Sequence, residues 1–274
     1  MTSLARIVAG ADAAPTLVLL HGITGSAVSL AEAIDHWVGG GYRVVAVDAR
    51  GHGLSPRWEP AQLERAGEVL VEDLIAVLEG LATDSRGRAA LGLAAPPAPV
   101  VIGHSMGAAT AMVAAGRRPD LVTGVVLEDP ARFGTRSPCE LLARGAARER
   151  ARAAEVADLP AAVGRALETM PDVEALPGVW ASQRTDPGLL LAGVVTPEVR
   201  WEEAMAALDV PALLLTGDRP GSARVGREGL ATAAGNPRIT PVLVPDAGHQ
   251  VRRSDPEAFY RTVDAWLTEV LPVG

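Results

Sequence analysis

The chain has no lysine, one cysteine and few aromatic residues, which make up only 3% of its 274 residues. The single cysteine, Cys139, excludes an internal disulfide. Without lysine there is no phosphate-binding loop of the P-loop type, so the glycines of Arg50-Gly51-His52-Gly53 do not indicate nucleotide binding. An excess of basic residues is also absent, because 33 acidic residues outnumber 25 basic ones and give a net charge of -8. This balance argues against nucleic acid as a partner.

Long apolar runs are missing as well. No segment has the length of a membrane span, and the first residues lack the basic and apolar regions of a secretory signal. We therefore expect a cytoplasmic protein that does not bind membranes, and its oligomeric state stays open. No group of His, Cys and Asp residues has the spacing of metal ligands, so neither a metal nor another cofactor is expected.

What the sequence does contain is an alternation of short apolar runs with helical stretches. The apolar runs are rich in Val, Leu and Ile without a polar alternation, which is typical of strands that are buried on both faces. The sequence therefore predicts an α/β fold with a mostly parallel central sheet and helices on both of its faces. The expected strands are 16–20, 43–48, 100–104, 124–128, 212–216 and 241–244, and the expected helices between them are 27–37, 61–81, 107–117, 222–234 and 256–271.

One segment interrupts this alternation. Residues 131–208 contain no convincing strand, but they contain helical pieces at 140–159, 161–170 and 197–207, separated by prolines. We expect this segment to be a helical cap above the carboxyl edge of the sheet. The core would then consist of residues 1–130 and 209–274.

The most informative motif is Gly103-His104-Ser105-Met106-Gly107, which follows a predicted strand and precedes a predicted helix. In a strand–turn–helix context, G-x-S-x-G presents the serine on a sharp turn above the sheet edge. The two glycines leave room for the backbone to turn that sharply. This context indicates that Ser105 is a nucleophile.

Polar and glycine residues also follow the other predicted strands, at the edge where ligands bind in open α/β sheets. With them the chain resembles the α/β-hydrolase superfamily, in the branch that carries a helical cap. The resemblance covers nearly the whole chain, and it depends on the order and spacing of six segments: HGITGS at 21–26, DARGHG at 48–53, GHSMG at 103–107, LEDP at 127–130, LLLTGD at 213–218 and DAGH at 246–249.

The resemblance implies a catalytic triad of serine, histidine and acid. His249 is the expected base, because it lies in a late loop after Gly248, where the family carries its histidine. The acid is open between two positions. In the commonest arrangement it lies three residues past a glycine after the next-to-last strand, but that position is Pro220 here. We therefore favour Asp129, at the end of the preceding strand, over Asp218, with Glu128 behind both.

The resemblance also implies an oxyanion hole formed by the backbone amides of Met106, which follows the nucleophile, and Ile23, in the loop after the first central strand. His21 matches a family position that shapes a loop beside the site. Phe133, Trp180 and Trp201, together with the Leu189-Leu190-Leu191 run, suggest an apolar pocket roof.

The resulting prediction is a cofactor-free serine hydrolase that cleaves a small apolar ester or lactone through an acyl-enzyme. The alternative is other chemistry on the same triad, such as C–C bond hydrolysis, lyase activity or peracid formation. A receptor that only binds its ligand is a third hypothesis, although a binding protein gains nothing from a strained serine turn.

Overall fold

A single seven-stranded sheet is the frame of the molecule in the computed structural model, which describes residues 3–131 and 137–273. The strand order is β1-β3-β2-β4-β5-β6-β7, with β1 antiparallel to β3 and every other neighbouring pair parallel. The mostly parallel sheet predicted from the sequence is confirmed. Its strands are β1 (Arg6–Ala9), β2 (Thr16–Leu20), β3 (Arg43–Val47), β4 (Val100–His104), β5 (Gly124–Glu128), β6 (Ala212–Gly217) and β7 (Ile239–Val244).

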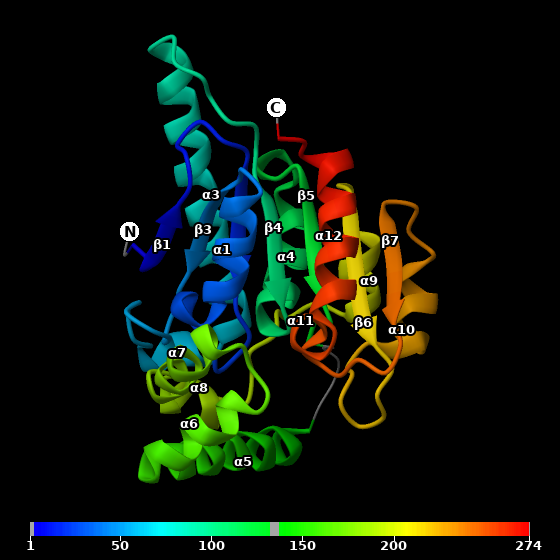
Figure 1. Cartoon of the computed structure of the whole chain (residues 1–274). Coiled ribbons are helices and arrows are strands. Elements are labelled where there is room, and N and C mark those ends of the chain that lie inside the picture. The colour runs from blue at the N-terminus through cyan, green and yellow to red at the C-terminus, as the bar shows by residue number, and fades with distance from the viewer. Residues whose placement is uncertain (1–2, 132–136, 274) are drawn as a thin grey trace.

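Helices cover both faces of this sheet (Figure 1). On one face α1 and α12 pack against side chains such as Leu19, Val44 and Leu213, and on the other α3, α4, α9 and α10 pack against Val18, Val45 and similar residues. The two sets alternate along each strand, because successive strand side chains point to opposite faces. The helices of the core are η1 (Ala27–Leu30), α1 (Ala31–Gly39), α2 (Pro60–Leu63), α3 (Ala66–Ala90), α4 (Met106–Arg117), η2 (Pro119–Leu121), α9 (Trp201–Ala206), α10 (Gly226–Ala233), α11 (Val251–Ser254) and α12 (Pro256–Val270).

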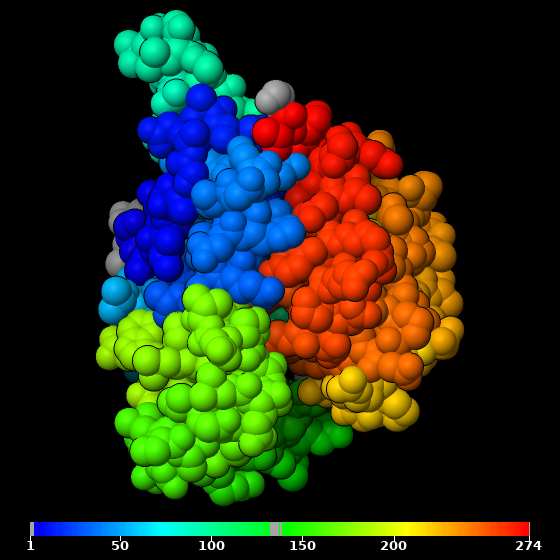
Figure 2. All heavy atoms as spheres, viewed as in Figure 1, coloured from blue at the N-terminus to red at the C-terminus, as the bar shows by residue number. Residues whose placement is uncertain are grey.

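Between β5 and β6, the regular elements that the described residues form are all helices. The first four, α5 (Pro138–Ala157), α6 (Leu159–Leu167), α7 (Asp172–Gln183) and α8 (Pro187–Ala192), lie below the carboxyl ends of the strands in Figure 1. Figure 2 shows the same segment, in green, covering that end of the molecule. These four helices, α5 to α8, form the cap.

Helix α9, the last helix before β6, does not belong to this cap. The sequence predicts that the cap comprises all of residues 131–208. Helix α9 instead packs against α4 in the core, where Trp201, Ala204 and Met205 are almost fully buried. These side chains belong to the same hydrophobic cluster as Val18 and Val45, because they follow one face of a short helix at the end of the insertion.

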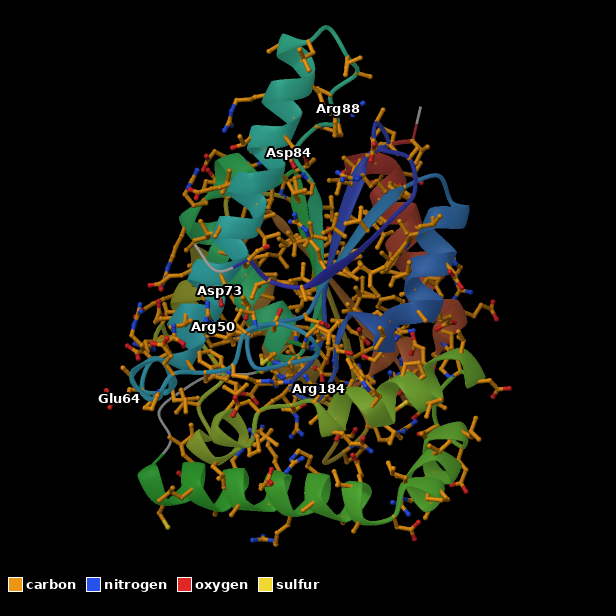
Figure 3. The ribbon with its side chains drawn as sticks, turned by 90° about the vertical axis from the view of Figure 1, so that its left-hand side faces the viewer. Arg50, Glu64, Asp73, Asp84, Arg88 and Arg184 are labelled. Atoms are coloured by element: carbon orange, nitrogen blue, oxygen red, sulfur yellow. The ribbon has the colours of Figure 1, made fainter. Side chains whose placement is uncertain are left out.

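The loop after β3 is fixed by an ion pair with the core. The guanidinium of Arg50 donates to both carboxylate oxygens of Asp73 on α3, at 2.8 Å each, and the two side chains lie together in Figure 3. Beyond this contact α3 continues out of the body of the molecule, as Asp84 and Arg88 show in the same view. Within the described ranges, no helix combines the length and the apolarity needed to cross a membrane.

Candidate active site

Ser105 occupies a strained turn between β4 and α4. Its φ of 52° lies in the left-handed region, which non-glycine residues seldom adopt. The flanking glycines allow the turn: a Cβ on Gly103 would lie 2.6 Å from the backbone of Ala108, and one on Gly107 would lie 2.6 Å from the carbonyl oxygen of Leu20. The chain therefore places the serine hydroxyl at the end of a central strand, at the N-terminus of a helix.

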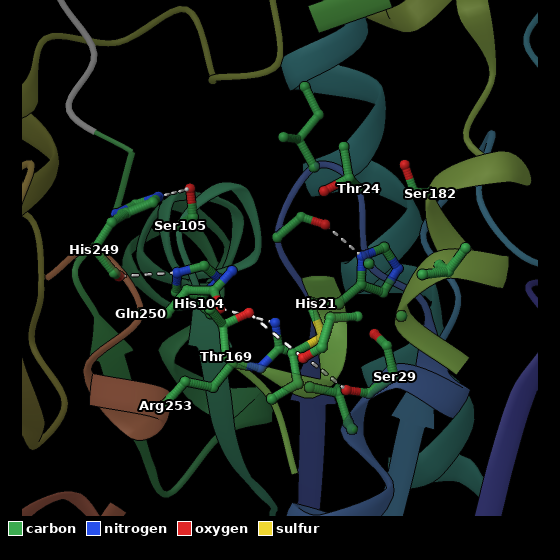
Figure 4. Close-up of a pocket in the computed structure, with 18 of the residues that line it drawn as sticks. His21, Thr24, Ser29, His104, Ser105, Thr169, Ser182, His249, Gln250 and Arg253 are labelled. Carbon is green, nitrogen blue, oxygen red and sulfur yellow. Dashed lines mark hydrogen bonds between the residues drawn. The ribbon is translucent and has the colours of Figure 1, made fainter. Parts of the chain in front are cut away.

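A continuous chain of hydrogen bonds leads away from this hydroxyl. The Ser105 Oγ lies 2.9 Å from Nε2 of His249, and Nδ1 of the same ring lies 2.6 Å from Oδ2 of Asp129. The carboxylate accepts a hydrogen bond from Nδ1–H, which holds the ring proton on Nδ1 and leaves Nε2 free to accept the serine proton. Figure 4 shows the contact between Ser105 and His249. The structure thus brings together the three side chains that the sequence singled out as nucleophile, base and favoured acid.

Asp129 is fully buried directly after β5, and its φ of 36° is again left-handed. Besides the imidazole, its carboxylate accepts hydrogen bonds from the Thr216 hydroxyl at 2.6 Å and from the backbone amides of Arg224 and Val225. These donors orient the carboxylate and stabilise its negative charge. Asp129 is therefore positioned rigidly against His249.

The two other carboxylates considered for this role contact different partners. Asp218 accepts a hydrogen bond from the backbone amide of Asp246 and pairs with Arg227. The bond from Asp246 is the main reason that the pKa of Asp218 is lowered. Glu128 accepts from the backbone amide of Arg252, and burial raises its pKa. As alternatives for the residue that contacts His249, both are wrong, because their side chains are turned to the loop that follows β7 and to α11.

The histidine itself lies on a loop that is bonded to the serine turn. Nε2 of His104 donates to the backbone carbonyl of His249 at 3.0 Å, and the backbone amide of His249 donates to the Ser222 hydroxyl. Burial lowers the pKa of His104 well below its usual value, so this ring is neutral. His104 thus connects the residue before the nucleophile to the histidine, a link that its place inside the motif did not reveal.

The amides expected for the oxyanion hole lie on two adjoining loops. Ile23 packs against the cluster that contains Met106. In the part of the chain that the structure describes, neither backbone amide donates to a protein acceptor. Nε2 of His52 lies 2.6 Å from the carbonyl oxygen of Ile23 and fixes this peptide.

His21 lines the cavity, but both of its ring nitrogens bind the surrounding loops. Nδ1 donates to the carbonyl of Gly22 at 2.7 Å, and Nε2 accepts from the amide of Ala49 at 3.0 Å. Burial, followed by the nearby His52, lowers the pKa of His21 to about 3. A second ring proton would face the N–H of Ala49, so the folded state keeps this ring neutral.

This arrangement predicts a loss of stability in acid. The folded pKa of His21 lies below the unfolded value, so the unfolded chain takes up the proton first as the pH falls. Stability contributed by the neutral ring is complete above pH 6.5 and is lost as the pH falls toward 3. His21 should contribute up to about 1.4 kcal/mol per pH unit to that slope. Urea unfolding at several pH values should show a shallower slope for His21→Asn, and an unchanged slope would contradict this role of the ring.

The cavity beside Ser105 and His249 has a volume of about 470 Å³ and is closed on one side by α5, α6 and α7. Most of the residues that line it carry polar side chains, several of which are labelled in Figure 4. The expected apolar roof is therefore wrong at two positions: Trp180 does not line the cavity, and Trp201 lies in the core. The leucines of the expected roof do not line it either, and Leu189 of α8 packs with Trp58 in a separate hydrophobic cluster. Phe133 lies outside the described residues.

No group of three or more His, Cys, Asp or Glu side chains within the described segments is arranged to hold a metal ion.

Comparisons with known proteins identify the family and the fold of the chain. A model of the family described as serine aminopeptidase, S33, matches residues 11–255. Epoxide hydrolase B of Mycobacterium tuberculosis is 36% identical over 112 residues, which are 41% of this chain and 28% of that protein. The chain thus spans less than a third of that relative. A 2-(acetamidomethylene)succinate hydrolase of Mesorhizobium japonicum is 27% identical over 266 residues, which are 92% of this chain and 88% of that protein.

Solved structures extend the likeness of the fold. The enol-lactonase of Burkholderia xenovorans superposes with a TM-score of 0.71 at 21% identity, over 97% of this chain and 96% of that one. At this identity the likeness shows the fold alone.

Proposed function

We propose that this chain, which belongs to the serine aminopeptidase S33 family within the α/β-hydrolase superfamily, cleaves an ester or a lactone by way of an acyl-enzyme. The observation that carries the proposal is the uninterrupted hydrogen-bond path from the Ser105 hydroxyl through His249 to the buried carboxylate of Asp129. A serine hydroxyl becomes a competent nucleophile only when a neighbouring base takes its proton during attack.

In the first half-reaction Ser105 Oγ attacks the carbonyl carbon while its proton passes to Nε2 of His249. The new charge on the imidazolium is stabilised by Asp129, and the charge on the former carbonyl oxygen by the amides of Ile23 and Met106. The C–O bond to the leaving group breaks as that oxygen takes the proton from His249. Water then attacks the acyl-enzyme by the same route and releases the carboxylic acid and the free serine.

The comparisons support a hydrolase but leave the bond open. A hydrolase of a succinate derivative and an enol-lactonase are among the similar proteins, and an epoxide hydrolase matches part of the chain. A small ester is favoured because Ser105 lines a cavity large enough for a small molecule and closed by the cap.

A fluorophosphonate probe tests the proposal directly. We expect it to label the protein once and to leave the adduct on the tryptic peptide that contains Ser105, because among the described residues only this hydroxyl contacts an imidazole backed by a carboxylate. Ser29 and Ser182 also line the cavity and serve as internal controls. Turnover of a p-nitrophenyl ester should show an initial burst if the acyl-enzyme accumulates. If the protein turns over the ester but the probe does not label it, the covalent route is refuted and other chemistry on this scaffold is favoured.

A further inference from the structure

Arginine side chains are concentrated in the wall of the active-site cavity, although the chain as a whole is acidic. The chain as a whole has eight more acidic than basic residues. The cavity, in contrast, is lined by five arginines and two glutamates: Arg148, Arg152, Arg165, Arg252, Arg253, Glu128 and Glu155. A guanidinium in such a wall attracts an anionic ligand only where no carboxylate of the protein already neutralises it.

Three of the arginines belong to the cap, and the helix periodicity turns them toward the cavity. On α5 the lining positions are 148, 151, 152 and 155, and on α6 they are 162, 165 and 166. Positions three and four residues apart share one face of a helix. If the cap only packed against the core, this face would be apolar. Here it combines arginines with alanines, and the small alanine side chains leave space beneath the guanidinium groups.

Most of these arginines already have a carboxylate partner. Arg152 forms two hydrogen bonds with Glu149 on its own helix. Arg252 and Arg253 share the fully buried Glu174 of α7, and Arg252 also contacts Glu32 at 2.6 Å. These pairs are neutral overall, so Arg152, Arg252 and Arg253 offer no uncompensated charge to a ligand.

Arg165 differs from its neighbours. Among the residues that the structure describes, no Asp or Glu carboxylate lies within 4.0 Å of its guanidinium, although it lines the same cavity as Ser105. The nearby acidic residue on the cap wall, Glu155, accepts a hydrogen bond from the Ser182 hydroxyl. Arg165 thus contributes a positive charge to the cavity that no carboxylate of the described chain neutralises.

We infer that the substrate carries a carboxylate in addition to the bond that is cleaved, and that Arg165 binds this carboxylate. This deepens the proposed function and rests on it. A guanidinium offers two parallel N–H donors that match the two oxygens of a carboxylate, so it fixes orientation as well as position. Anchored by Arg165 of α6, the substrate would present its acyl carbon to Ser105, which lines the same cavity.

Two matched esters test the inference. Monomethyl succinate and methyl succinamate have nearly the same shape, but only the first ends in a carboxylate. We expect the wild type to favour monomethyl succinate in kcat/KM. Arg165→Met should lower kcat/KM for monomethyl succinate by about 10- to 100-fold, as expected for the loss of a hydrogen bond to a charged group. Its kcat/KM for methyl succinamate should stay within about twofold, because Arg165 contacts only the carboxylate.

Arg150→Met is the control, because Arg150 lies on α5 but is exposed and does not line the cavity. It should leave both values unchanged. Equal kcat/KM for the two esters in the wild type, or a preference that survives Arg165→Met, would overturn the inference while leaving the serine mechanism intact.

A second measurement does not require turnover. Succinate should slow fluorophosphonate labelling of Ser105 in the wild type more than uncharged succinamide does, and Arg165→Met should remove the difference. If both compounds act alike on the wild type, the carboxylate site is disproved. If Ser105 is never labelled, it is the proposed function that fails.

Discussion

Ser105→Ala is expected to lower kcat for a p-nitrophenyl ester by a factor on the order of 10⁴ to 10⁶, because the variant has no oxygen to form the acyl-enzyme. The residual rate would come from the oxyanion-binding amides and from substrate binding alone. The fold should persist. Alanine removes one polar atom, and Gly103 and Gly107, which leave room for the turn, are unchanged in the variant.

Activity and thermal unfolding of the purified variant should be measured together. A melting temperature close to that of the wild type, combined with loss of turnover and of fluorophosphonate labelling, supports the role of Ser105. A variant that keeps more than about a hundredth of the wild-type kcat contradicts it. Within the described chain, Ser105 is the one serine whose hydroxyl contacts the ring of His249, whereas the Ser222 hydroxyl accepts from the backbone amide of that residue.

Asp129→Asn should have the second-largest effect, a loss of roughly 10⁴-fold in kcat. The asparagine can turn its amide nitrogen toward Nδ1 of His249, which must then accept a hydrogen bond. The ring proton moves to Nε2, where it donates to the serine instead of receiving its proton. The backbone should tolerate the change, because asparagine is among the residues that adopt the left-handed conformation seen at this position.

Asp218→Asn is the matched control. Asp218 stabilises the turn before His249 by accepting from Asp246, so its replacement should reduce kcat by less than about tenfold. The pH dependence of kcat/KM separates a lost triad acid from a loosened loop, because only the former changes the protonation of the histidine. Equal losses in the two variants would mean that Asp129 has no special role.

The central strands could be predicted because they are uniform runs of Val, Leu and Ile, and β2, β4 and β5 begin and end where the sequence places them. The antiparallel strand β1 was missed, because its four residues alternate between exposed and half-buried at the sheet edge and lack such a run. Helix α7 was missed because Pro177 lies inside it. The helix expected at 61–81 is divided at residues 64–65 and extends to Ala90, well past the last core contact.

At the site, the G-x-S-x-G motif identified Ser105 and the resemblance to the family identified His249, but the sequence could only favour Asp129. Which carboxylate contacts the imidazole depends on how the loops after β5, β6 and β7 fold over one another. No local pattern records that Asp218 turns to Asp246. The cavity lining was harder still, because arginines at helical spacing in the cap are indistinguishable in sequence from a solvated helix surface.

Glu174 has a consequence for how such enzymes can be rebuilt. Its carboxylate comes from α7 and contacts two guanidiniums that follow His249 by three and four residues. A chain that joins residue 130 directly to 209, or that receives a foreign lid without an acid at this place, would leave Arg253 without its carboxylate and Arg252 with Glu32 alone, close to His249. In this architecture the lid cannot be exchanged as a separate module, because it completes the electrostatics of the machinery beneath it.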